Sequence, residues 1–108
     1  MKRHKLDDMR GGWFVGQFEP AALRLAECEV AVKRYRAGDH EPSHVHRLAV
    51  ELTLVIAGRV TMNGEAFCEG DIIELAPGEP GEFRVLEDAI TVVVKSPSVP
   101  SDKHVLKD

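Results

Sequence analysis

Residues 38–58 read GDHEPSHVHRLAVELTLVIAG, and they hold the pattern from which the rest of the chain can be interpreted. His44 and His46 stand two residues apart, and residues i and i+2 of a β-strand point to the same face. Glu51 follows after enough residues for a turn and the start of a second strand. The spacing therefore predicts that two imidazoles and one carboxylate meet at one point, a donor set that suits a divalent first-row metal.

The flanking residues form short β-rich runs that glycine and proline interrupt. The chain contains 9 Gly and 6 Pro, and Asn63-Gly64 supplies the positive φ angles of a type I′ hairpin turn. Short strands at regular spacing indicate an all-β sandwich or barrel. A weak helical pattern occurs only at 20–26, and the tail from Ser96 is predicted to be irregular. The expected strands are 27–36, 50–57, 59–62, 65–68, 72–75, 83–86 and 90–95.

Length and charge exclude several classes of protein. A chain of 108 residues has room for one core, so we expect a single domain over 1–108. A formal net charge of −4 argues against nucleic-acid binding through a basic face. No apolar segment of a signal peptide follows the charged start, and the apolar run 52–57 is too short to span a membrane. We therefore expect a cytoplasmic protein without nucleic-acid or membrane partners, with Cys28 and Cys68 reduced.

Two segments together resemble a known family. In 38–58 the order is glycine, five residues, H-x-H, four residues, glutamate, six residues and glycine, which resembles the first cupin motif at every defined position. Residues 70–84 begin GDIIELAPG, which resembles the second cupin motif, a strand that leads into a Pro-Gly turn. The resemblance covers close to half of the chain. It implies a small jelly-roll β-barrel of the cupin type, usually dimeric, in which His44, His46 and Glu51 take three metal-ligand positions.

The second motif departs from the family at the fourth ligand position. Cupins with a full metal set have a histidine three residues after the Pro-Gly glycine, and here that position is Gly81, which cannot bind a metal. Glu82 is its neighbour, but a shift of one residue turns a strand side chain to the other face unless a bulge brings it back. The resemblance thus implies a three-ligand site for a divalent transition metal (iron, manganese, nickel or zinc), or a site that has lost its metal.

Three functions stay open at this point. The first is a metal-dependent cupin that acts on or binds a small polar molecule. Residues 44–47, HVHR, also resemble cupin-type nucleotide-sugar ketoisomerases, in which a histidine pair moves protons without a metal; that group typically has glutamine where Glu51 stands. The third is a barrel that holds a small ligand without turnover. The sequence identifies neither substrate nor metal and leaves open whether the protein is an enzyme; Arg47, Arg59 and Arg84 are available for an anion, although solvation is the default for each.

The walls and the outer face of the barrel give two further expectations. Met62, Phe83 and Val94 are candidates for the apolar wall of the pocket. The run 52–56 is apolar on both pleat faces, whereas one face of a lone small barrel normally meets water. We therefore expect a second subunit to cover this run in a homodimer, with the segment around Trp13 as the alternative cover.

Overall fold

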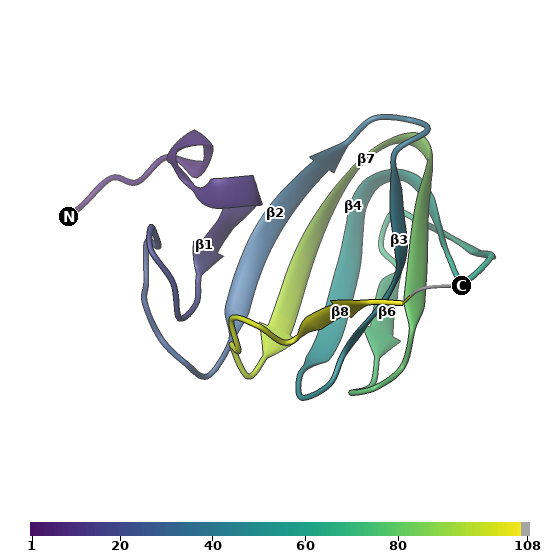
Figure 1. Ribbon diagram of the computed structural model, residues 1–108. Coiled ribbons are helices and arrows are strands. Elements are labelled where there is room, and N and C mark those ends of the chain that lie inside the picture. The colour runs from purple at the N-terminus through teal and green to yellow at the C-terminus, as the bar shows by residue number, and fades with distance from the viewer. Residues whose placement is uncertain (107–108) are drawn as a thin grey trace.

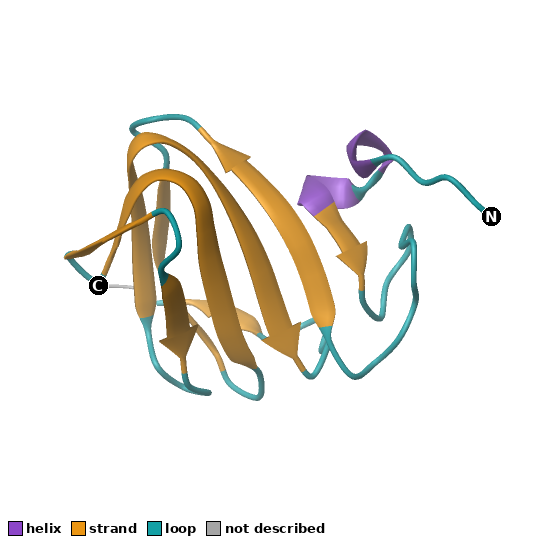
Figure 2. Ribbon diagram, turned by 180° about the vertical axis from the view of Figure 1, so that it is seen from behind, coloured by secondary structure: helices purple, strands orange, loops and turns teal. Residues whose placement is uncertain are grey.

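The computed structural model describes residues 1–106 as a curled antiparallel sheet (Figure 1, and from behind in Figure 2), which confirms the all-β class. Two short 3₁₀ turns, Leu6–Asp8 and Arg10–Gly12, precede the first strand. Within the described residues, no helix has the length and apolar character needed to cross a membrane. The strands are β1 (Trp13–Val15), β2 (Glu29–Tyr35), β3 (His40–His46), β4 (Val50–Met62), β5 (Glu65–Cys68), β6 (Ile72–Leu75), β7 (Gly81–Ser96) and β8 (Lys103–Val105).

The two longest strands, β4 and β7, organise the sheet. They pair antiparallel from Val50 opposite Ser96 to Met62 opposite Phe83. The first half of β4 and the second half of β7 form one arm, which β6 and β2 extend, with β1 at the edge. The other halves form a second arm, which β5, β3 and finally β8 extend. Both long strands curve over midway (Figure 1), so the two arms face each other as the layers of a jelly roll.

Gly58 makes the bend of β4 possible. Its φ is +91°, a region that residues with a Cβ rarely adopt, and the pairing with β7 shifts register on either side of it. A Cβ on Gly58 would lie 2.2 Å from the carbonyl oxygen of Asp88 and 2.7 Å from Cα of Ala89. The two backbones are therefore in contact at the bend, and only glycine leaves room for this approach.

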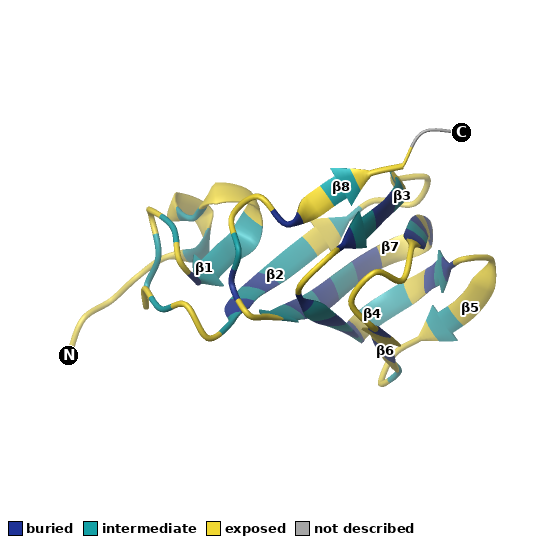
Figure 3. Ribbon diagram, turned by 60° about the horizontal axis from the view of Figure 1, so that its bottom comes forward, coloured by how far each residue is buried: buried dark blue, intermediate teal, exposed yellow. Residues whose placement is uncertain are grey.

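The core fills the space between the arms. Inward-facing residues alternate with outward-facing ones along β4 and β7, which gives the striped burial in Figure 3. Tyr35 and Phe67 pack against the core from its margin. The buried apolar cluster consists of Val55, Val60, Met62, Ile73, Leu75, Phe83, Val85 and Ala89.

The predicted strand breaks at the bend were wrong. The expected strands 50–57 and 59–62 are one strand, β4, because Gly58 bends the chain without ending the ladder. The expected strands 83–86 and 90–95 are likewise joined in β7. The intervening polar residues lie exposed on the outside of the curve and stay in the extended conformation.

The predictions for 20–26 and for the tail were also wrong. No helix forms at 20–26; this segment folds back on β1, and the backbone N–H of Ala22 donates to the carbonyl oxygen of Phe14 (2.8 Å). The tail contains β8, which pairs with the end of β3. A strand of three residues has too little hydrophobic periodicity to be found in the sequence.

We predict that Gly58→Ala destabilises the protein by about 3 kcal/mol, because it combines a strained φ with a backbone clash. Gly64→Ala is the matched control: its φ is +82°, but nothing lies within 4 Å of the added Cβ, so about 1 kcal/mol is expected. Urea unfolding of both variants measures the difference. Equal free energies of unfolding would contradict the contact at the bend.

Candidate metal site

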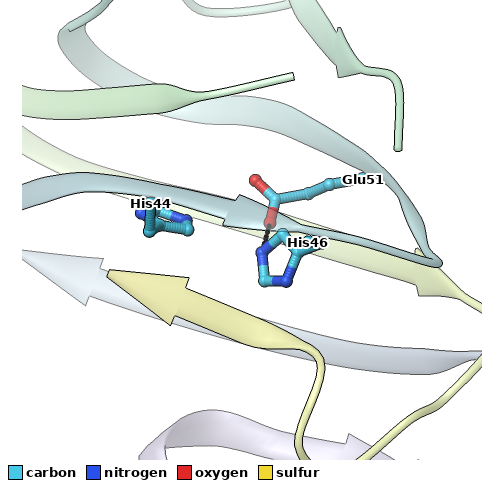
Figure 4. Close-up of side chains that lie close together, drawn as sticks. All are labelled: His44, His46 and Glu51. Atoms are coloured by element: carbon cyan, nitrogen blue, oxygen red, sulfur yellow. Dashed lines mark ion pairs between the residues drawn. The ribbon is translucent and has the colours of Figure 1, made fainter. Parts of the chain in front are cut away.

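Three side chains from two strands meet inside the curled sheet, as the spacing predicted. His44 and His46 project from the end of β3, and Glu51 projects from the start of β4. Their exposed fractions are 6%, 5% and 8%. The potential ligand atoms of the three residues all lie within 4.8 Å of one another. Figure 4 shows the Glu51 carboxylate directed at the His46 ring, with His44 farther along the same strand.

The β3–β4 loop between these ligands is held by the C-terminal segment. The backbone N–H groups of Leu48 and Ala49 each donate to the carboxylate of Asp102 at 2.9 Å. Burial alone raises the pKa of Asp102, but these backbone donors outweigh it and hold the pKa below its usual value. Asp102 therefore stays ionised and fixes the turn that sets His46 and Glu51 at their separation.

His44 is oriented by the backbone. Its Nδ1 lies 3.0 Å from the carbonyl oxygen of Pro42, which can only accept, so Nδ1 carries the proton in the neutral ring. The Nε2 lone pair is then free for a ligand. A second ring nitrogen bonded to a carbonyl is the usual support of a metal-binding histidine.

His46 and Glu51 form a direct contact of 2.9 Å between Nε2 and Oε2. Burial raises the pKa of Glu51, but the hydrogen bond from His46 and the nearby positive groups, Lys95 among them, bring the pKa below its usual value. Among the described residues, Nδ1 of His46 is buried without a hydrogen-bond partner. In either neutral tautomer of His46, Nδ1 therefore lacks a hydrogen-bond partner from the protein, whether it carries the proton or the lone pair.

These residues fit a metal ion. Donors on opposite sides of one ion lie about 4.2 Å apart, given metal–ligand distances of about 2.1 Å. The three donors are within 4.8 Å, so only small side-chain rotations are needed to close on an ion. Two neutral imidazoles and a carboxylate suit iron, manganese, nickel or zinc.

The fourth ligand position is filled by apolar side chains. Gly81 pairs with His44 across β7 and β3, so a side chain there would point toward the site. A Cβ on Gly81 would lie 2.7 Å from Cδ1 of Leu75 and 3.1 Å from Sδ of Met62. Glu82 lies away from the site: its carboxylate is 3.6 Å from Nε2 of His40, which is exposed.

A cavity of about 130 Å³ opens onto the three ligands. Met62 and Phe83 line it as expected, but Val94 does not. The prediction for Val94 was wrong because β7 is apolar on both faces in this region, so its inward set cannot be read from hydrophobicity; Val93 is the inward residue. Tyr35 also lines the cavity, and its hydroxyl donates to Glu41 (3.1 Å).

Burial and the Glu41 charge raise the pKa of Tyr35, so the phenol stays protonated.

Besides Tyr35 and Val93, six residues that line the cavity were not expected from the sequence: Trp13, Lys33, Glu41, Thr53, Lys95 and Lys103. The inward position of Lys33 could have been predicted from the sequence, because the alternation of 27–36 places it on the same face as the buried Ala31. Lys103 had no such signal, because it faces inward only through the pairing of β8 with β3, opposite His46. Arg47, Arg59 and Arg84, considered for an anion, do not line the cavity.

We predict that Asp102→Asn lowers the free energy of unfolding by about 1–2 kcal/mol at pH 7, because it leaves a buried N–H of the loop without a charged acceptor. The folded-state pKa of Asp102 is depressed, so its stabilisation is present above the unfolded pKa of about 3.9 and is lost as pH falls through the folded pKa. The wild-type–variant difference should thus be constant from about pH 7 to 5 and shrink below about pH 4. Urea unfolding across this range checks it; a difference that changes between pH 7 and 5 would contradict the assignment.

Comparisons with known proteins support the fold. No family model matches the sequence, and no curated protein matches it significantly. An uncharacterised conserved protein with a double-stranded β-helix domain from Klebsiella pneumoniae is 20% identical, with a TM-score of 0.72 over 99% of this chain and 93% of that one. An RmlC-like cupin from Shewanella frigidimarina is 19% identical, with a TM-score of 0.63 over 69% of this chain and 70% of that one.

A third similar structure is larger than this protein. The DMSP lyase DddQ from Ruegeria pomeroyi is 20% identical, with a TM-score of 0.70 over 84% of this chain. The match spans 48% of the lyase, about half of its length. At these identities the likeness concerns the fold alone. Together with the bent β4–β7 pair and the two facing arms, it shows that this chain has a double-stranded β-helix fold, similar to that of the RmlC-like cupin.

Proposed function

We propose that this protein is a metal-binding cupin in which His44, His46 and Glu51 hold one divalent transition ion. The observation that carries the proposal is the convergence of three buried donors, with Nε2 of His44 freed by the bond of its Nδ1 to a backbone carbonyl. The cavity in front of these donors has room for a small polar molecule. Iron, manganese, nickel and zinc all suit this donor set.

The ion, when bound, would supply Lewis-acid or redox chemistry, depending on the element. The residues of this chain would bind and orient the molecule in front of it. Phe83 and Met62 form the apolar side of the cavity, and Tyr35 keeps its proton and directs it to Glu41. The protein would supply only three donors, because Gly81 has none, so the positions on the ion that face the cavity would be available to the small molecule.

The His46–Glu51 contact favours one alternative. A carboxylate 2.9 Å from an imidazole nitrogen can hold the ring in one tautomer and stabilise its charged form, which is the arrangement of a proton-transfer pair. A metal-free isomerase that resembles the nucleotide-sugar ketoisomerases would use this pair directly. The metal content of the purified protein distinguishes the metal-binding cupin from the metal-free isomerase.

We predict about one transition ion per chain in protein purified without a metal-affinity tag, measured by elemental mass spectrometry. Glu51→Ala should weaken binding of the identified ion by at least about tenfold, because it removes the only anionic donor. Affinity should also fall toward acidic pH, because a protonated imidazole cannot bind a metal.

The matched control is Glu74→Ala, which removes an exposed carboxylate of β6, the strand that pairs with the start of β4. If Glu51→Ala holds the ion as tightly as Glu74→Ala between pH 6 and 8, the ligand set is wrong. If offered metal washes off the wild-type protein, the metal-free alternative replaces the proposal.

We also propose that the protein is a homodimer that pairs through the outer face of the first arm. Leu52 and Leu54 of β4 are half-buried there, Ile72 of β6 is 63% exposed, and Val92 of β7 continues the apolar band. Trp13 itself lines the cavity on the opposite, inner face. The segment around it, the alternative cover, reaches the outer face at β2, where Leu6, Met9 and Phe14 line a hollow with Val32, the residue opposite Val92. We infer that a second copy covers the rest of the band, at Leu52, Leu54 and Ile72.

We predict that the wild-type protein elutes as a dimer in size-exclusion chromatography with light scattering, and that Leu54→Glu shifts it to the monomer. A charge in the middle of an apolar interface is left without a partner. Leu86→Glu, an exposed position on the other arm of β7, should leave the dimer intact. A monomeric wild-type protein would refute the assignment.

Both cysteines are free, and Cys68 is exposed. This fits the reducing cytoplasm, where we propose that the protein resides.

A further inference from the structure

Three lysines from three strands surround the cavity in front of the metal ligands. Lys33 comes from β2, Lys95 from β7 and Lys103 from β8. The ring of Trp13 lies among them: its centroid is 5.3 Å from Nζ of Lys33 and 4.6 Å from Nζ of Lys95. Lysine side chains normally extend their ammonium groups into water. Three lysines that face one cavity therefore need an explanation.

Among the described residues, Lys95 alone of the three lysines has its charge paired. Its Nζ is 2.9 Å from Oε1 of Glu29, whose other oxygen accepts a hydrogen bond from Ser98 (2.7 Å). Within residues 1–106, neither Lys33 nor Lys103 makes an ion pair with a carboxylate. Two unpaired ammonium groups therefore remain at the cavity.

The positive charges of the two unpaired lysines repel each other. Burial lowers the pKa of Lys33; the charge of Glu41 opposes this shift, and the positive charges of Lys103 and Lys95 add to it. Glu41 is already engaged by the Tyr35 hydroxyl at 3.1 Å. An anion between the two ammonium groups would relieve this repulsion.

The charge balance also favours an anion. Lys33, Lys95 and Lys103 are matched in number by the carboxylates of Glu29, Glu41 and Glu51 at the cavity and its margin. A divalent ion on His44, His46 and Glu51 would thus leave the region with an excess of two positive charges.

We propose that the cavity binds a small organic acid, with its carboxylate between Lys33 and Lys103 and its other end toward His44, His46 and Glu51. The second half of this statement rests on the proposed metal site. The cavity is small, about 130 Å³, so the acid is short.

The walls favour a carboxylate with a hydrocarbon part over inorganic phosphate. Trp13, Phe83, Met62 and Val93 give the cavity apolar surface that a short carbon chain can contact. No arginine lines the cavity, so the planar fork that suits phosphate oxygens is missing from it. Lysine supplies point charges that a single carboxylate can satisfy.

The test uses the full chain loaded with Zn²⁺, and titrates it with propionate, with propanamide as the neutral counterpart and with inorganic phosphate. Trp13 is the only tryptophan, so its indole N–H signal in a nitrogen–proton NMR spectrum reports on the cavity alone. Propionate should shift this signal in a saturable way at constant ionic strength, and propanamide and phosphate should bind at least about tenfold more weakly.

Lys33→Met and Lys103→Met should each weaken propionate binding by about tenfold, whereas Arg34→Met should leave it unchanged. Arg34 lies next to Lys33 on β2, is exposed and does not line the cavity, so it controls for loss of net charge. Equal propionate binding by the lysine variants and the arginine variant would overturn the inference, as would preferential binding of propanamide or phosphate.

Zinc content measured on the same samples keeps the two proposals apart. Zinc bound without any propionate-induced shift of the Trp13 signal would overturn the organic-acid inference and leave the metal site standing. Lysine-dependent propionate binding in protein that does not retain zinc would uphold the carboxylate position and refute the metal site.

Discussion

The backbone contact between Gly58 and the turn of β7 at Asp88 and Ala89 is the constraint on which the rest of the structure depends. It allows two long strands to stay paired while they fold over. Without this contact, the paired strands β4 and β7 would stay flat, with the residues that now face inward on one open face. With it, Val55 and Val60 lie on facing arms, and the core closes between them. The absence of a side chain at Gly58 therefore determines how the whole sheet folds over.

The site uses the space that this folding creates near the open end of the two arms. The end of β3 supplies the histidines from the second arm, and the start of β4 supplies the glutamate from the first. A bulge in β3 between Glu41 and His44 changes the alternation, so that Glu41 and the two histidines all line the cavity. The polar groups are thus concentrated at the mouth, while apolar side chains fill the closed end at the bend.

Local patterns predicted much of this arrangement. The spacing of His44, His46 and Glu51 was sufficient to predict their convergence, and Asn63 and Gly64 have the positive φ angles, 53° and 82°, of the expected hairpin turn. Local sequence patterns did not predict the features that depend on contacts between distant parts of the chain. Nothing near Lys103 in sequence shows that it faces His46, because that direction follows from the pairing of β8 with β3. In the same way, no local signal distinguishes a glycine that bends a strand from one that ends it.

The bonds of Asp102 join positions more than fifty residues apart, and β8 lies beside the histidines that precede this loop. During synthesis on the ribosome, the histidines and Glu51 emerge early, but the carboxylate that fixes their loop and the lysine that faces His46 emerge among the last residues of the described chain. Both follow Ala89, the last residue of the buried apolar cluster, along the chain. The order of the chain thus places the groups that complete the binding geometry after those that form the core.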